Sequence, residues 1–309
     1  MRTLAVVVAA VLAAGSVAGG QSPTTIVRDV RTAIAADDVA GAERLVEQAR
    51  AERGDTPENL AALSWLGRAA LAAGRHEQAA QYAADTYELT VAALRTRDLD
   101  EDANLQTALG AAIEVEALAR AARGDRSAAV YFLQRELETY GGSPIHTRIQ
   151  KNLNVLSLEG QPAPALVAGE RLGEALPGFD QLKGKPVLLF FWAHWCPDCK
   201  AQGPALARLL EKYGPQGLEI VAPTQLYGYV AARRQAPPDE ELRYIAGIRD
   251  EFYAFLQDEA TPVSEANHLR YGVSTTPTLA LVDRDGIVRL YHPGQMTEEA
   301  LEEAIRAVL

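Results

Sequence analysis

The sequence contains very little cysteine, since Cys196 and Cys199 are the only two in 309 residues. Without a second pair, the chain lacks the four-thiolate set of a structural zinc site. The five histidines are scattered without ligand spacing and lie at positions 76, 146, 194, 268 and 292. We therefore expect no metal site and no bound cofactor.

The chain also lacks an excess of basic residues. Its formal net charge is -11, and acidic residues outnumber basic ones in both halves, 20 to 15 over residues 22–158 and 21 to 14 over residues 159–309. Nucleic acids are bound through clustered lysine and arginine. The composition therefore excludes nucleic acid as a partner.

A long uncharged run opens the chain. It extends from Thr3 to Gly20, follows a single arginine and ends in small residues. A membrane-spanning helix needs about 20 strongly apolar residues, whereas this run is rich in alanine and glycine. We predict that residues 1–20 are a signal peptide, cleaved or retained as an anchor, that directs export to the periplasm or another extracytoplasmic compartment.

Residues 21–158 have almost no strand pattern, and we predict an all-α, antiparallel helical domain there. Apolar residues recur at helical spacing, and the breaks between them carry Gly, Asp and Pro. Trp65, Tyr82, Tyr87 and Tyr131 fall among these apolar residues, so we expect them in the core. The predicted helices cover residues 24–36, 39–53, 57–73, 76–97, 103–123, 126–140 and 145–157.

A repeat is visible at the helix turns. Gly67, Gly74, Ala79 and Ala83 follow the spacing of a tetratricopeptide-like helix pair, and part of the pattern returns after Gly124. The region resembles degenerate tetratricopeptide repeats, although a plain helical bundle stays an alternative because the intervals are irregular. Such stacks usually present a groove to a protein partner, but these helices would equally serve to pack on themselves or to form a dimer.

The two cysteines lie between an apolar run, 186–192, and a helical pattern, 200–213. This order predicts a buried strand that turns directly into a helix. Cys196 would then lie at the helix start, where free N–H groups and the helix dipole stabilise a thiolate. Cys199, one turn further on, would resolve a mixed disulfide formed at Cys196. The pair therefore indicates redox chemistry.

At these residues the chain resembles the thioredoxin superfamily, and within it the extracytoplasmic TlpA/ResA-like reductases. Pro204 lies where the family's first long helix is kinked, and residues 275–278, Thr-Thr-Pro-Thr, resemble the loop whose cis-proline faces the dithiol. The resemblance covers residues 159–309. It implies an α/β thioredoxin fold there, with a mixed central sheet covered by helices.

Several elements of this second domain follow from pattern. We predict a short hairpin over 166–172 and a strand over 218–222 in a parallel crossover. Residues 223–262 form an insertion, with a loop over 224–238 and an amphipathic helix over 239–256. The remaining predicted elements are strands over 278–282 and 287–291 and a last helix over 297–309.

The residues around the dithiol have expected roles. Trp195 would shield one side of the dithiol and contact substrate, and Pro197 would restrain the turn. Asp198 would disfavour the thiolate and so weaken oxidising power. His194 would offset that effect when protonated, or would be an exposed loop residue without a role.

The loop at Thr276 and Pro277 is expected to complete the site. A cis bond there would let the backbone of Thr276 pair with an extended substrate segment. The resemblance also shows two losses. Thioredoxins have a buried acid at the position of Phe190, and ResA-like proteins have an acid at the position of Gln202.

The sequence thus predicts an exported thiol-disulfide oxidoreductase that reduces disulfides in client proteins through its Cys-Pro-Asp-Cys dithiol. A membrane thiol reductase would supply the electrons. One alternative is a tetratricopeptide-type interaction protein whose thioredoxin-like domain only senses redox state. Another is a peroxidase of the same fold, although residues 191–195 lack the threonine and proline that such enzymes place before the reactive cysteine.

Overall fold

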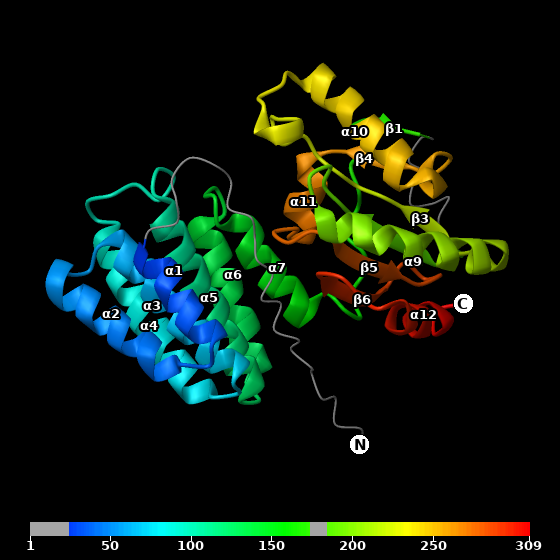
Figure 1. The fold of residues 1–309 in the computed structure, drawn as a ribbon. Helices are drawn as coiled ribbons and strands as arrows, with labels where there is room; N and C mark the ends of the chain where they lie inside the picture. The colour runs from blue at the N-terminus through cyan, green and yellow to red at the C-terminus, as the bar shows by residue number, and fades with distance from the viewer. Residues whose placement is uncertain (1–24, 174–183) are drawn as a thin grey trace. The chain divides into compact units, whose positions relative to one another are not determined.

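The computed structural model describes residues 25–173 and 184–309, and the chain divides into two compact units, Met1–Ile149 and Gln150–Leu309 (Figure 1). The boundary between the units falls after Ile149, within the last predicted helix of the helical domain, whereas the predicted boundary is after residue 158. The predicted signal peptide lies outside the described residues. Among the described helices, none combines the length and the apolar character needed to cross a membrane.

The described residues contain all seven predicted helices, and the first unit is built of the first six and the start of the seventh. Side-chain caps begin several of them: Asp38 accepts from the N–H of Gly41 at 2.7 Å, and Asp102 accepts from that of Leu105 at 3.1 Å. Such caps satisfy backbone donors that have no partner within the helix. The helices are α1 (Thr25–Ala35), α2 (Val39–Arg53), α3 (Pro57–Ala72), α4 (His76–Ala93), α5 (Ala103–Ala122), α6 (Arg126–Tyr140) and α7 (His146–Ser157).

Small residues bring α3, α4 and α5 together, as the repeat pattern predicts. Ala79 and Ala83 of α4 are buried against Val115 of α5. A Cβ added to Gly67 of α3 would lie 3.4 Å from the Cβ of Tyr82 and 3.5 Å from a methyl group of Val115. These are ordinary van der Waals distances, so the three helices approach closely but a methyl group would still fit at this point. The tetratricopeptide-like assignment itself stays a prediction.

The predicted placement of aromatic residues is partly wrong. Trp65, Tyr82 and Tyr87 are half-buried, but Tyr131 is 64% exposed. The buried residues of α6 include Ala129 and Leu133, which are four residues apart and therefore share one face. Tyr131 lies midway between them in sequence, about 200° round the helix from each. Tyr131 therefore points away from the buried face of α6, although its neighbours in sequence are apolar.

The second unit is organised by a four-stranded mixed sheet in the order β3-β2-β5-β6. The parallel pairing of β2 with β3 confirms the predicted crossover, and β5 runs antiparallel to both β2 and β6. The strands are β2 (Val187–Phe191), β3 (Glu219–Val221), β5 (Thr278–Val282) and β6 (Val288–Pro293). The helices of this unit are α9 (Pro197–Tyr213), α10 (Pro238–Phe252), α11 (Glu265–Tyr271) and α12 (Glu298–Arg306).

Both faces of β2 are buried, and its residues alternate between two cores. Leu188 and Phe190 pack with apolar residues of α9, α10 and α12. Val187, Leu189 and Phe191 pack on the other face with residues that include Tyr271 of α11. This explains why the strand is a continuous apolar run. Burial on both faces also fixes the position of Phe191, after which the chain leaves the sheet towards the cysteines.

The predicted hairpin over 166–172 is wrong. The structure instead forms β1 (Glu170–Leu172), which pairs antiparallel with β4 (Thr261–Val263). Neither β4 nor α11 is predicted from the sequence. Both are too short to show a period, and β4 contains a proline, which argues against a strand.

A close backbone approach follows α11. Gly272 adopts a left-handed conformation with φ of 61°, and a Cβ placed on it would lie 2.3 Å from the backbone nitrogen of Lys151. Only glycine fits here, because any side chain would collide with backbone and also strain φ. Nearby, the side-chain amide of Asn154 donates to the carbonyl of Arg270 at 3.5 Å.

Buried His268 predicts a pH-dependent stability. It is 2% exposed, packs edge-on against Phe191, and burial lowers its pKa to about 4 from 6.5. As the pH falls from 6.5 to 4, the unfolded chain takes up a proton that the folded chain does not. The free energy of unfolding should therefore fall by about 3 kcal/mol over this range. We expect His268→Leu to remove that fall, as measured by urea unfolding between pH 6.5 and 4.

The matched control is His292→Gln, which changes a half-buried histidine outside the core cluster. It should keep the pH dependence of the unmodified protein. An identical pH dependence in His268→Leu and the unmodified protein would contradict the expected low pKa.

Candidate functional site

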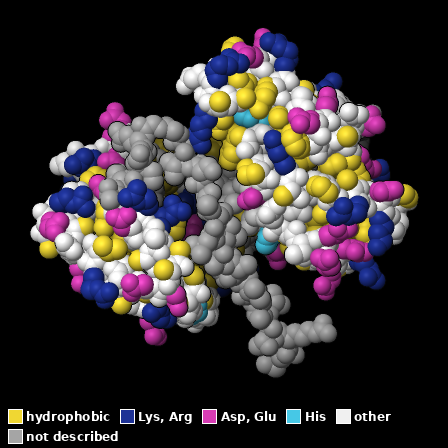
Figure 2. Space-filling view, viewed as in Figure 1, with side chains coloured by type: hydrophobic (Ala, Val, Ile, Leu, Met, Phe, Trp, Pro, Cys, Tyr) yellow, Lys and Arg dark blue, Asp and Glu magenta, His cyan; other side chains and the backbone are white. Residues whose placement is uncertain are grey.

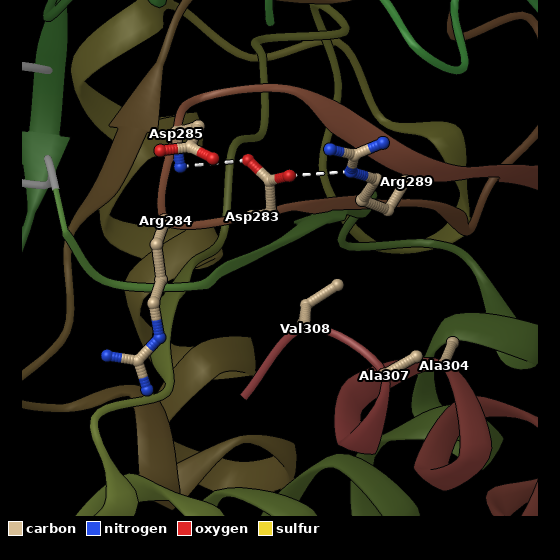
Figure 3. A pocket seen from close by; sticks show the side chains of 7 residues that line it. All are labelled: Asp283, Arg284, Asp285, Arg289, Ala304, Ala307 and Val308. Atoms are coloured by element: carbon tan, nitrogen blue, oxygen red, sulfur yellow. Dashed lines mark hydrogen bonds and ion pairs between the residues drawn. The ribbon is translucent and has the colours of Figure 1, made fainter.

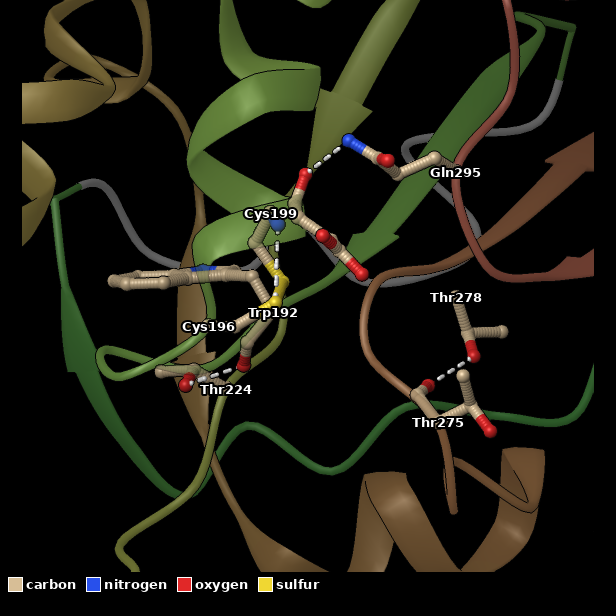
Figure 4. The surroundings of a disulfide bond; sticks show 8 residues. Trp192, Cys196, Cys199, Thr224, Thr275, Thr278 and Gln295 are labelled. Carbon is tan, nitrogen blue, oxygen red and sulfur yellow. Dashed lines mark hydrogen bonds between the residues drawn. A yellow bond between two sulfur atoms is a disulfide. The ribbon is translucent and has the colours of Figure 1, made fainter. Parts of the chain in front are cut away.

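Cys196 and Cys199 are joined by a disulfide at the point where β2 leads into α9 (Figure 4). Cys196 is the N-cap of the helix, and its sulfur accepts from the backbone N–H of Cys199 at 3.0 Å. Pro197 occupies the first helical position, where its missing N–H costs nothing and its fixed φ suits the helix. The local sequence therefore places the sulfur of Cys196 at the N-terminus of α9.

Both cysteines are buried in this disulfide form. Cys196 is 2% exposed and Cys199 is fully buried. The difference in exposure between the two cysteines is therefore small, although only Cys196 keeps any accessible surface. The position at the helix start, with a backbone N–H directed at its sulfur, is the stronger distinction between them.

The loop before β5 lies across from the disulfide. The Thr276–Pro277 bond is cis, as predicted. Thr278 pairs with Phe191 at the end of β2, and its hydroxyl donates to the carbonyl of Thr275 at 2.7 Å. Figure 4 shows Thr275 and Thr278 on this loop, across from the two sulfurs. The register of β2 with β5 thus brings the predicted substrate loop to the cysteines.

Beneath the disulfide, Trp192 is fixed by two hydrogen bonds to the next segment. Its indole N–H donates to the carbonyl of Ala222 at 3.0 Å, and its own carbonyl accepts from the hydroxyl of Thr224 at 2.9 Å. The indole is fully buried and lies 5.0 Å from the ring of Tyr253. Trp192 is therefore a core residue that anchors the turn carrying the cysteines.

His194 is buried, and this corrects the expectation of an exposed loop residue. It is 2% exposed, and its Nε2 lies 3.3 Å from Oε1 of Glu241 in α10. Burial lowers the pKa of His194, although Glu241 acts in the opposite direction. Burial therefore opposes the protonated form of His194, on which its predicted tuning of the cysteines depends.

Glu241 is the residue that the sequence analysis misses. It is fully buried, and its two carboxylate oxygens accept from the backbone N–H groups of Tyr227 and Gly228 at 2.6 and 2.8 Å. In the sequence it follows Asp239 and Glu240 as one of three acids in the first turn of a helix. Such acids are usually solvated and complement the helix dipole, so no local signal distinguishes Glu241.

Other residues near the cysteines are more open. Trp195 is 47% exposed and packs edge-on against Tyr227, with ring centroids 5.5 Å apart. Asp198 is exposed, so solvent screens the effect of its carboxylate on the sulfurs. The ammonium group of Lys200 lies 4.0 Å from the ring centroid of Phe252.

Gln202 has a structural partner. It is 2% exposed, and its side-chain oxygen accepts from the backbone N–H of Met296 at 2.9 Å. Next to it, the side chain of Gln295 donates to the carbonyl of Asp198 at 2.8 Å (Figure 4). These two bonds tie the loop after β6 to the first turns of α9. The expected acid position is thus occupied by a neutral acceptor.

A separate hollow of about 520 Å³ lies at the opposite end of the sheet (Figure 3). There Asp283 accepts from Arg289 and from the N–H of Asp285. Asp283 follows the end of β5 that pairs with Val187, whereas the cysteines follow the other end of β2. The hollow is therefore remote from the disulfide. Its lining residues are Asp283, Arg284, Asp285, Arg289, Ala304, Ala307 and Val308.

Within residues 25–173 and 184–309, no group of three His, Cys, Asp or Glu side chains is placed to hold a metal ion. On the face drawn in Figure 2, Lys and Arg side chains are interspersed with Asp and Glu. That face therefore offers no continuous basic surface of the kind that binds nucleic acid.

Comparison with known proteins gives consistent matches to the second unit. A family model described as a thioredoxin-like domain matches residues 181–309. The thioredoxin-like protein YneN of Bacillus subtilis strain 168 is 29% identical over 147 residues, which cover 48% of this chain and 78% of that protein.

A second relative and a solved structure are also similar to part of this chain. The thiol-disulfide oxidoreductase ResA of Bacillus thuringiensis subsp. konkukian is 30% identical over 149 residues, covering 48% of this chain and 78% of the relative. Among solved structures, a thiol-disulfide isomerase from Corynebacterium glutamicum is 20% identical, with a TM-score of 0.38 over 48% of this chain and 96% of that chain.

The bond from Met296 to Gln202 leads to a test. Gln202→Ala should lower the hydrogen-exchange protection of the Met296 amide roughly fivefold, because a lost hydrogen bond costs about 1 kcal/mol. Gln202→Glu keeps an acceptor oxygen and should preserve the protection. The amide of Gly294, which donates to the carbonyl of Pro277 at 2.8 Å, is the internal control. Equal protection of Met296 in all three proteins would refute the bond.

Proposed function

Because the second half of this chain belongs to the thioredoxin-like family of ResA-type thiol-disulfide oxidoreductases, we propose that it reduces disulfides in client proteins through Cys196 and Cys199. Its thioredoxin fold and its thiol-disulfide oxidoreductase class follow from that membership. The observation that carries the proposal is the Cys196–Cys199 disulfide at the start of α9, with the N–H of Cys199 directed at the sulfur of Cys196.

The proposed reaction has two exchange steps. In the reduced protein the thiolate of Cys196 attacks one sulfur of a client disulfide, so a mixed disulfide forms and the other client sulfur leaves as a thiolate that takes a proton. The thiolate of Cys199 then attacks the sulfur of Cys196. The second client thiol is released and the Cys196–Cys199 disulfide forms. Two electrons pass to the client, and a membrane thiol reductase would restore them.

The surroundings assign further roles within this proposal. Trp195, which is exposed beside the disulfide, and the loop at Thr276 and Pro277 would contact the client. Pro197 and Asp198 would tune the couple, with the exposed Asp198 exerting a weak effect. We also propose that the protein is exported, since reduction of client disulfides is required where disulfides persist.

Two cysteine variants test the proposal. Cys196→Ser removes the attacking sulfur and should lower insulin reduction at least a hundredfold against the dithiothreitol background. Cys199→Ser should still attack but fail to resolve, so a mixed disulfide with insulin should accumulate on a non-reducing gel. Insulin reduction by Cys196→Ser at the rate of the unmodified protein would overturn the proposal.

A further inference from the structure

The insertion over residues 223–262 contains a buried carboxylate, that of Glu241, which holds the loop of the insertion. Glu241, in the first turn of α10, uses both carboxylate oxygens to hold the backbone N–H groups of Tyr227 and Gly228. The two bonds span 13 and 14 residues of sequence and close the loop onto its own helix. Since the carboxylate is fully buried, its removal would leave those two donors without an acceptor.

The same carboxylate reaches the turn that carries the cysteines. Its Oε1 lies 3.3 Å from Nε2 of His194, two residues before Cys196. The His194 ring contacts three tyrosines of the insertion edge-on, with centroid distances of 5.3 to 5.5 Å. These are Tyr227, Tyr229 and Tyr244. His194 is therefore held between the insertion and the turn.

The first residues of this loop are partly exposed to solvent. Tyr227 packs against Trp195, which is 47% exposed, and the preceding Leu226 is 36% exposed. The other large apolar side chains that are exposed among the described residues are Tyr131, Val155 and Phe252. Exposed apolar groups that gather at one place on a soluble protein commonly mark a binding surface. Here Trp195 directly precedes Cys196, and Leu226 directly precedes the tyrosine that packs on Trp195.

We propose that Glu241 is a positioning residue that holds Leu226 and Tyr227 beside Trp195, and that this surface favours client disulfides flanked by apolar side chains. The inference rests on the proposed disulfide reduction and assigns its client preference. Glu241 acts through the loop and through His194 and does not itself contact the client. The preference for apolar clients is then set by the loop of the insertion and not by the turn that carries the cysteines.

Two peptides of equal length provide the test, each with one disulfide, flanked by leucine in one and by glycine in the other. We expect the unmodified protein to have a higher kcat/KM for the leucine peptide. Leu226→Ser and Glu241→Gln should each lower the leucine-to-glycine ratio of kcat/KM about fivefold, mainly through KM. Val155→Ser, which alters an exposed apolar residue of α7, is the matched control and should keep the ratio.

The outcomes separate the two claims. A ratio unchanged in both Leu226→Ser and Glu241→Gln would overturn this inference, as would an equal slowing of both peptides by Glu241→Gln with no effect of Leu226→Ser. Leu226 is on the surface, so its variant keeps the test valid if Glu241→Gln unfolds. Failure of the unmodified protein to reduce either peptide would overturn the proposed function, and this inference with it.

Discussion

The site depends on one constraint, the burial of β2 on both faces. Because each residue from Val187 to Phe191 is fixed in one of two cores, the chain leaves the sheet at a single point and direction. The turn that follows then places Cys196 as the N-cap of α9, with the N–H of Cys199 on its sulfur. Pairing of β2 with β5 brings the loop at Pro277 to the same end.

Much of this arrangement is readable from the sequence, for physical reasons. A doubly buried strand gives a continuous apolar run, and the helices of the first unit are long enough to show their period and their capping residues. The cis bond before Pro277 is indicated by the motif around it. What escapes prediction is short or depends on distant partners. β4 has three residues, and the pairing of β1 with it spans about 90 residues of sequence.

The burial of His194 and Glu241 shows the same limit more sharply. Glutamate is rarely buried unless it is paired, and Glu241 is buried here because it meets His194 and two backbone donors from the loop. This pair also changes the view of proton transfer. With Phe190 and Gln202 in place of an acid, the described structure offers no carboxylate at either expected position, and burial lowers the pKa of the nearby His194.

The insertion also has clamped ends. Thr224 donates its N–H to the carbonyl of Pro262 at 3.0 Å and accepts from the N–H of Ser264 at 2.9 Å, while the N–H of Ala222 bonds to the carbonyl of Ala260. Entry and exit therefore sit side by side on the sheet edge, whatever the length of chain between them. Between these ends, α10 packs in the same core as the two cysteines, and Glu241 holds the segment to the turn before them. Substitutions at solvent-exposed positions such as Leu226 would therefore change the surface offered to other proteins while the fold around the disulfide is kept.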